Sequence, residues 1–251
     1  MKTIIKILTI VTFFCAIAPT LNAQKNNFKQ KDPISRVASM TEKYFLIDTS
    51  REPGEQIILS HYYISSFDDN GNRVEDIEFD SKDKQLKKYK YSYTGDQRDT
   101  LIITDSEAKL MRTIIYSYDD NGLLANDQSY DANGKPEKQF VYKYDEEGVL
   151  REDYSYLNSG EFNMKFTYTY DYKGNIDRNF RFSADGNLKE VRHYKYDENN
   201  NIVSEIVKND SGDTLKSTVY QYVYDKKNNW VEKTIIIDNQ PVKLIKRKLT
   251  Y

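Results

Sequence analysis

The chain has 251 residues, of which 37 are basic and 39 acidic, so its formal net charge is −2 at pH 7. Basic and acidic residues are interleaved, without the basic excess or stripe typical of nucleic-acid binding or of attraction to an anionic membrane surface, which argues against both partner classes. The 22 tyrosines and 11 phenylalanines in a chain that is only 38% hydrophobic favour strands packed through aromatic rings.

The first 23 residues have the pattern of a secretory signal peptide. Lys2 and Lys6 precede a short apolar run over residues 7–18, and residues 21–23 (Leu-Asn-Ala) offer a small residue at the cleavage point. The run is shorter than the ~20 residues that a membrane-spanning helix needs, and polar residues follow it, which argues against an uncleaved anchor. We therefore predict an exported protein with no membrane span after cleavage of residues 1–23.

The single cysteine, Cys15, lies inside this apolar run. Phe13 and Phe14 precede it, where a lipid-anchoring signal needs small residues, so we do not expect a lipoprotein. The mature chain would have no disulfide, which suits a bacterial periplasm, cell surface or exterior better than a eukaryotic secretory route.

Residues 24–56 do not share the pattern that follows and are predicted to be an N-terminal extension or cap. Asp32-Pro33 could begin a short helix. The alternative is an irregular segment with a strand at Tyr44–Ile47, and the sequence does not decide between the two. Either could cover the first edge of a sheet.

From residue 57 to residue 251 the chain repeats every 25 to 28 residues, which we interpret as seven units of one domain. In one unit, Phe140–Tyr144 is the first predicted strand, Asp145–Gly148 a turn, and Val149–Tyr156 the second strand. The units align on an aromatic residue before an acidic turn: Phe67, Tyr93, Tyr118, Tyr144, Tyr170, Tyr196 and Tyr224.

A half-unit of about 13 residues is too short for a strand and a crossover helix, so successive strands must be antiparallel neighbours joined by hairpins. Alternation places both rings of each Tyr-x-Tyr on one face, and Asp-x-Asn-Gly and Asp-x-x-Gly suit tight turns. We predict an all-β fold, an antiparallel meander of about 14 strands that forms a long twisted and curled sheet and could close on itself.

The recurring pattern Tyr-x-Tyr-Asp-x-x-Gly-x-Leu/Ile resembles the YD repeat of the RHS family. It is clearest at Tyr142–Leu150, Tyr168–Ile176 and Tyr194–Ile202, and it covers about residues 57–251. In that family, long arrays form a β-strand spiral that encloses a toxin domain, so the resemblance implies a β-repeat architecture. With its few units and no appended toxin domain, the chain looks more like short, exported YD-repeat proteins than like an enclosing shell.

The sequence offers no distinct catalytic or metal-binding constellation. His61 and His193 lie far apart and neither accompanies a nucleophile motif or enough ligands for zinc. Calcium binding by the acidic turns is an alternative, but a four-residue turn rarely offers six to eight oxygens. We predict no enzyme activity, no cofactor and no metal, and interpret as turn-forming the acids Asp119, Asp145, Asp171, Asp197 and Asp225.

The tyrosine rows are the candidate binding surface. Cross-strand aromatic pairs would stabilise the sheet, and a tyrosine joins a flat ring to a hydrogen-bonding tip, so the rows could also be a ligand platform. The candidate platform residues are Tyr116, Tyr118, Tyr142, Tyr144, Tyr168, Tyr170, Tyr194 and Tyr196.

We therefore expect an exported, non-enzymatic binding or structural module that recognises a surface polysaccharide or a cell-envelope protein. One alternative is a small glycan-acting hydrolase that uses acids outside the turns, such as Glu152 and Asp153. Another is a cell-surface component that assembles through exposed strand edges. An outer-membrane barrel is not expected, because the strand face of Leu150 and Tyr154 also carries Glu152, whereas lipid-facing positions should be apolar.

Overall fold

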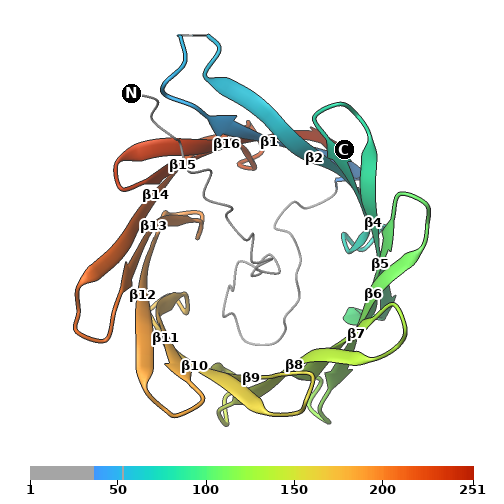
Figure 1. Ribbon diagram of the computed structural model, residues 1–251, viewed down its shortest axis with the longest axis vertical. Helices are drawn as coiled ribbons and strands as arrows, with labels where there is room; N and C mark the ends of the chain where they lie inside the picture. The colour runs from blue at the N-terminus through green and yellow to red at the C-terminus, as the bar shows by residue number, and fades with distance from the viewer. Residues whose placement is uncertain (1–36, 53) are drawn as a thin grey trace, which may run out of the picture.

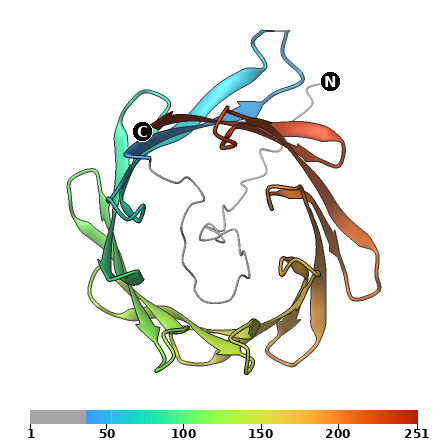
Figure 2. The same ribbon diagram turned by 180° about the vertical axis from the view of Figure 1, so that it is seen from behind.

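The computed structural model describes residues 37–52 and 54–251, and the strands of these residues form one closed barrel (Figures 1 and 2). The strands follow one another around the ring in chain order, each antiparallel to its neighbours. They are β1 (Ser39–Ile47), β2 (Ile57–Phe67), β3 (Arg73–Asp80), β4 (Gln85–Thr94), β5 (Gln97–Asp105), β6 (Leu110–Tyr118), β7 (Leu124–Asp131), β8 (Pro136–Tyr144), β9 (Leu150–Tyr156), β10 (Phe162–Tyr170), β11 (Ile176–Ser183), β12 (Leu188–Tyr196), β13 (Ile202–Lys208), β14 (Thr214–Tyr224), β15 (Trp230–Ile237) and β16 (Gln240–Thr250).

Two strands outside the predicted hairpin units close the ring. β1 and β16 pair antiparallel, from Ser39 opposite Thr250 to Leu46 opposite Lys243. On its other side β1 pairs with β2, and β16 pairs with β15. Every described strand therefore has a partner on both sides, and no free edge offers its backbone groups to another chain.

β1 lies in the segment 24–56 that precedes the repeats, where the strand alternative at Tyr44–Ile47 agrees with the structure. The possible helix start at Asp32-Pro33 lies outside the described residues, as does the predicted signal peptide, residues 1–23. The described part of the chain contains no helix that is long and apolar enough to span a membrane.

The prediction of a long, curled sheet of about 14 strands is wrong, because the sheet is a closed barrel, although the all-β antiparallel meander is present. The implied YD-repeat architecture of the RHS family is wrong as well, because the strands close into one ring instead of continuing as a spiral. The physical reason is that closure depends on the number, tilt and stagger of all the strands together. The repeat units omitted β1 and β16, the two strands that complete the ring.

The acidic turns have one recurring geometry. In the turn after β8, the Asp145 carboxylate accepts hydrogen bonds from the backbone N–H groups of Glu147 (3.0 Å) and Val149 (2.9 Å). The N–H of Gly148 donates to the carbonyl oxygen of Asp145 at 3.0 Å, and Gly148 has φ = 76°. A carboxylate at the first position and a residue that tolerates positive φ at the fourth therefore define these turns.

Ala108 occupies the glycine position of such a turn, with φ = 63° and its N–H donating to the carbonyl oxygen of Asp105. Because a Cβ is unfavourable in the left-handed region, we expect Ala108→Gly to raise the free energy of unfolding by about 0.5–1 kcal/mol. Urea titration of the purified protein measures this change. The matched control is Gly134→Ala, at the same position of the turn after β7 (φ = 77°), which should lose stability; equal signs for the two variants would contradict the argument.

One face of each strand points into the barrel and the other points outward. Residues directly opposite each other in a ladder share a face of the sheet. The pairs Tyr142–Asp153 and Asp153–Phe166 therefore place these residues of β8, β9 and β10 on the same face. The fully buried polar residues Ser65, Ser155 and Thr218 lie on this face. Side chains crowd together on the concave side of a ring, so this face lines the lumen.

Candidate lumenal binding belt

Tyrosines on even-numbered strands alternate with mostly polar residues on odd-numbered strands around much of the lumen. The ladders place each of these residues opposite, or diagonal to, its neighbour on the same face. We call this set the lumenal belt: Asp76, Tyr91, Leu101, Tyr116, Asp127, Tyr142, Asp153, Tyr168, Asn179, Tyr194, Glu205, Tyr220 and Lys233.

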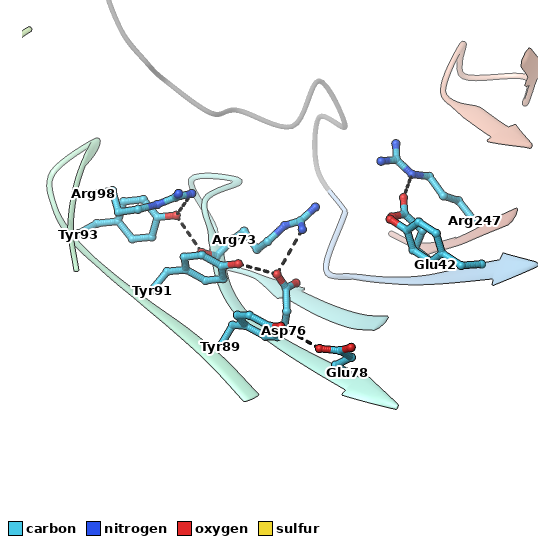
Figure 3. A network of polar contacts seen from close by, with 10 residues as sticks. Glu42, Arg73, Asp76, Glu78, Tyr89, Tyr91, Tyr93, Arg98 and Arg247 are labelled. Atoms are coloured by element: carbon cyan, nitrogen blue, oxygen red, sulfur yellow. Dashed lines mark hydrogen bonds and ion pairs between the residues drawn. The ribbon is translucent and has the colours of Figure 1, made fainter. Parts of the chain in front are cut away.

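Four belt tyrosines hold an acid on the preceding strand. Each hydroxyl donates to a carboxylate 15 residues earlier in the chain: Tyr91 to Asp76 (2.7 Å), Tyr142 to Asp127 (2.5 Å), Tyr168 to Asp153, and Tyr220 to Glu205 (2.9 Å). Figure 3 shows the first of these pairs, together with Tyr89, which donates to Glu78 at 2.8 Å. The tyrosine rows therefore bind buried acids in addition to packing against one another.

The second tyrosine of each Tyr-x-Tyr has a different partner. Its hydroxyl donates to a backbone carbonyl 20 residues earlier, at the residue where the preceding hairpin has a β-bulge, as Tyr144 does to Leu124 at 2.9 Å. A bulge leaves ladder groups unpaired, and the tyrosine of the next unit satisfies one of them. The same bond joins Tyr93 to Arg73, Tyr118 to Arg98, Tyr170 to Leu150, Tyr196 to Ile176, and Tyr222 to Ile202.

The eight predicted platform tyrosines thus lie on one lumenal face, with two kinds of position. Tyr118, Tyr144, Tyr170 and Tyr196 satisfy backbone carbonyls near one end of the strands. Tyr116, Tyr142, Tyr168 and Tyr194 lie in the belt itself, and all eight rings are only partly buried. Most of their hydroxyls donate hydrogen bonds within the barrel wall, so the surface available to a ligand consists of the faces and edges of the rings.

Asp127 and Asp153 are the acids of the belt that have no ion pair among the described residues. Burial raises the pKa of Asp127 to about 6 and that of Asp153 to about 7. The Asp127 charge contributes to the rise at Asp153, whereas the hydrogen bond from Tyr168 and the positive charge of Lys138 oppose it. These two carboxyls therefore change their protonation near neutral pH.

Other acids of the lumen are matched by arginines. Glu190 binds both Arg181 and Arg192 at 2.7 Å, and Arg192 also binds Glu205 at 2.8 Å. Burial alone would raise the pKa of Glu190, but its two arginines outweigh burial and hold the pKa below its usual value.

Lys233 lies on β15, on the opposite side of the ring from the strands of Asp127 and Asp153 (Figure 1). Burial, and then the neighbouring Arg247, lower the pKa of Lys233 to about 8, and its ammonium lies 4.5 Å from the centre of the Tyr220 ring. A lysine with a lowered pKa therefore lies across the ring from two acids with raised pKa values.

The outer wall mixes apolar and charged side chains. Ion pairs join adjacent strands there, between Lys88 and Glu75 (2.7 Å), Lys165 and Glu152 (2.5 Å), and Lys246 and Glu232 (2.9 Å). Exposed aliphatic residues such as Ile102 and Val219 lie among them. This composition differs from the uniform apolar band of a lipid-facing wall.

The two histidines lie in different surroundings. His61 faces the lumen and stacks on Tyr44, with ring centres 4.6 Å apart. His193 lies opposite Arg178 and Ile206 on the outward face. Residues 37–52 and 54–251 contain no group of three or more histidine, cysteine, aspartate or glutamate residues arranged to hold a metal ion.

Sequence reasoning found the tyrosines and missed their partners. The signal was present, because one aligned position of the units carries Asp76, Leu101, Asp127, Asp153, Asn179 and Glu205. The mixture of acidic, amide and apolar residues at this position resembles ordinary variation at a protein surface. Only the barrel shows that the position faces the lumen.

The sequence matches no known family model and no curated protein. The fold is similar to that of a porin-like protein from Bacteroides uniformis, with 12% identity, coverage of 85% of this chain and 96% of that one, and a TM-score of 0.57. A porin-like protein from Bacteroides vulgatus shares 14% identity over 86% and 98% of the two chains, with a TM-score of 0.45, too low to support an argument.

The first of these similarities shows a shared barrel fold and corrects the family assignment. The assignment to YD or RHS repeat proteins rested on a local turn-and-tyrosine pattern, whereas the alignment with the porin-like protein extends over 85% of this chain. Tyr-x-Tyr followed by an acidic turn is therefore the local signature of a tyrosine-lined hairpin, and such hairpins can be built into different architectures.

Proposed function

We propose that this protein is an exported, non-enzymatic barrel that binds a polar chain molecule, an oligosaccharide or a polysaccharide segment, in its lumen. The observation that carries the proposal is the lumenal belt of partly exposed tyrosine rings interleaved with carboxyl, amide and amine groups. A closed barrel of this many strands is too wide for the side chains of its own wall to fill.

The chemistry of the belt suits a sugar. A tyrosine ring offers a flat apolar surface to the C–H face of a sugar ring, and nearby polar groups can bind its hydroxyls. Asp127, which is partly exposed, accepts a hydrogen bond from Tyr142 through one oxygen, and a carboxyl has further acceptor capacity. Export is supported by the predicted signal peptide and agrees with the porin-like description of the similar structure.

The geometry does not favour the two alternatives. Glu152 and Asp153, the acids considered for a hydrolase, are adjacent in β9 and point to opposite sides of the wall. Asp153 is only 6% exposed and is held by Tyr168, so it is not presented to a substrate. Assembly through strand edges lacks a basis, because each described strand is paired on both sides.

A glycan-array screen with matched variants tests the proposal. Tyr116→Leu combined with Tyr194→Leu removes two belt rings whose loss leaves no acid without its tyrosine. We expect the parent protein to bind a subset of glycans and the double variant to bind them at least about tenfold more weakly, since an aromatic contact contributes about 0.5–1.5 kcal/mol. The control, Tyr154→Leu on the outer wall, should bind like the parent.

Two results would reject the proposal. One is the absence of binding to any glycan by the folded parent. The other is unchanged binding by the folded lumenal double variant, which would move the binding surface away from the belt.

A further inference from the structure

One position of the lumenal belt lacks the polar group that its equivalents carry. Leu101 stands where neighbouring units have Asp76 and Asp127. Tyr116 therefore has no acid 15 residues earlier to receive its hydroxyl proton, unlike Tyr91 and Tyr142. The tyrosine instead has the Arg98 guanidinium over its ring.

Arg98 is surrounded by tyrosine rings. Its guanidinium carbon lies 4.7 Å from the ring centre of Tyr91, 5.6 Å from that of Tyr116 and 5.7 Å from that of Tyr93. Nη2 donates to the Tyr93 hydroxyl at 3.2 Å, and the buried Nε has no hydrogen-bond partner (Figure 3). The aromatic faces stabilise the cation, but none of them supplies a negative charge.

Arg98 also differs from the other arginines of the lumen. Arg73 pairs with Asp76 at 3.3 Å, Arg192 with Glu190, and Arg247 with Glu42. Within the described residues Arg98 forms no ion pair with any carboxylate. Arg98 lies opposite Tyr93 on the lumenal face, and the residue is only partly buried.

We propose that Arg98 and Tyr116 form a binding site for the carboxylate or sulfate of an acidic sugar in the lumen. This inference rests on the proposed function and narrows its ligand to acidic oligosaccharides. A guanidinium offers several N–H donors in a planar fork that matches an oxyanion, and the Tyr116 hydroxyl adds another donor. Because residue 101 is leucine, this position of the belt offers Arg98 no carboxylate, whereas Asp76 pairs with Arg73 one unit earlier.

The test compares one probe in two charge states. Tetragalacturonate and its methyl ester have the same sugar rings, but only the first carries carboxylates. We expect the parent to bind the acid form at least about tenfold more tightly, because hydrogen bonds to charged groups are stronger than those to neutral groups. A sulfated oligosaccharide measured beside its desulfated form distinguishes a sulfate-selective site from a carboxylate-selective one.

Two variants remove the site in different ways. Arg98→Gln removes the charge, and Leu101→Asp supplies the acid that the neighbouring units have, so that Arg98 pairs within the wall. Both should lose the preference for acidic probes and retain binding of the methyl ester. Arg151→Gln is the control, because Arg151 lies 5.5 Å from the ring centre of Tyr170 and is already paired with Asp145 at 2.7 Å.

The outcomes separate this inference from the proposed function. Equal binding of charged and neutral probes by the parent, or an acidic preference that survives in folded Leu101→Asp protein, would overturn the anion site and leave the lumenal glycan site standing. No binding of these probes by a parent that binds other glycans on the array would overturn the anion site alone, and no binding of any glycan would overturn both. If Arg98→Gln does not fold, Leu101→Asp decides, since it restores the arrangement seen at Asp127.

Discussion

Replacing Asp153 with asparagine is expected to stabilise the barrel at pH 8 and to weaken the dependence of its stability on pH. Burial raises the pKa of Asp153 to about 7 in the folded chain, whereas an unfolded aspartate has a pKa of about 3.9. The folded state thus binds this proton more tightly, and the resulting stability is fully present below about pH 4 and lost as pH rises through about 7.

The pKa difference of about 3 units sets an upper limit of about 4 kcal/mol, and we expect a gain of about 1–3 kcal/mol for Asp153→Asn at pH 8. The asparagine oxygen can still accept the hydrogen bond of Tyr168. Guanidinium unfolding at pH 5 and pH 8 measures the effect. The contribution of Asp153 should make the parent more stable at pH 5 than at pH 8. At pH 5 the variant should therefore be little more stable than the parent.

Glu152→Gln is the control, one residue away on the outer side of the wall. Hydrogen bonds from Lys165 and Tyr154 lower the pKa of Glu152, so its neutralisation should bring a small loss at either pH. If Asp153→Asn loses more than about 1 kcal/mol at pH 8, the carboxylate is better accommodated in the wall than its burial implies.

Replacing Arg247 with leucine is expected to destabilise the protein by about 3–5 kcal/mol, the largest loss that we predict for a single substitution. Arg247 on β16 pairs with Glu42 on β1, across the two strands that close the ring, and each side chain is only 11% exposed. Its guanidinium carbon also lies 3.4 Å from the centre of the Trp230 ring. The variant leaves the Glu42 carboxylate buried beside an apolar side chain.

Thermal and urea unfolding of three proteins test this prediction. Adding Glu42→Gln to Arg247→Leu removes the buried carboxylate charge that has lost its ion-pair partner. The double variant should therefore recover much of the lost stability. Lys246→Leu breaks the exposed pair with Glu232 on the outer face of the same strand, where the expected change is within about 1 kcal/mol. Similar losses of stability for Arg247→Leu and Lys246→Leu would show that the Arg247–Glu42 ion pair stabilises the barrel no more than an exposed ion pair does.

The repeats combine regularity with a few informative exceptions. The carbonyl-binding tyrosines, such as Tyr144 and Tyr196, recur because each unit contains the same bulge. The belt position between them varies, from Asp127 to Leu101 to Lys233, because many side chains fit into a wide lumen. The scaffold is therefore set by the constant positions, and the chemistry of the lumen by the variable one.

The local structure of the strands and turns could be predicted from the sequence alone. Alternation fixed which side chains of Phe140–Tyr144 share a face, and Asp145 with Gly148 fixed the turn that follows. Both depend on interactions within a few residues, namely strand pleat, turn hydrogen bonds and the conformational freedom of glycine. The tyrosine rows on one face followed from the same rules, so the candidate platform was visible before the fold was known.

The closure of the sheet, and the choice of the face that lies inside, became apparent only from the complete fold. Closure joins Ser39 to Thr250, at opposite ends of the described chain, and no local pattern specifies such a pairing. Both faces of the strands mix aromatic and charged residues, so hydrophobicity did not distinguish lumen from exterior. The burial that raises the pKa of Asp153, and the missing acid beside Arg98, exist only once curvature has turned one face inward.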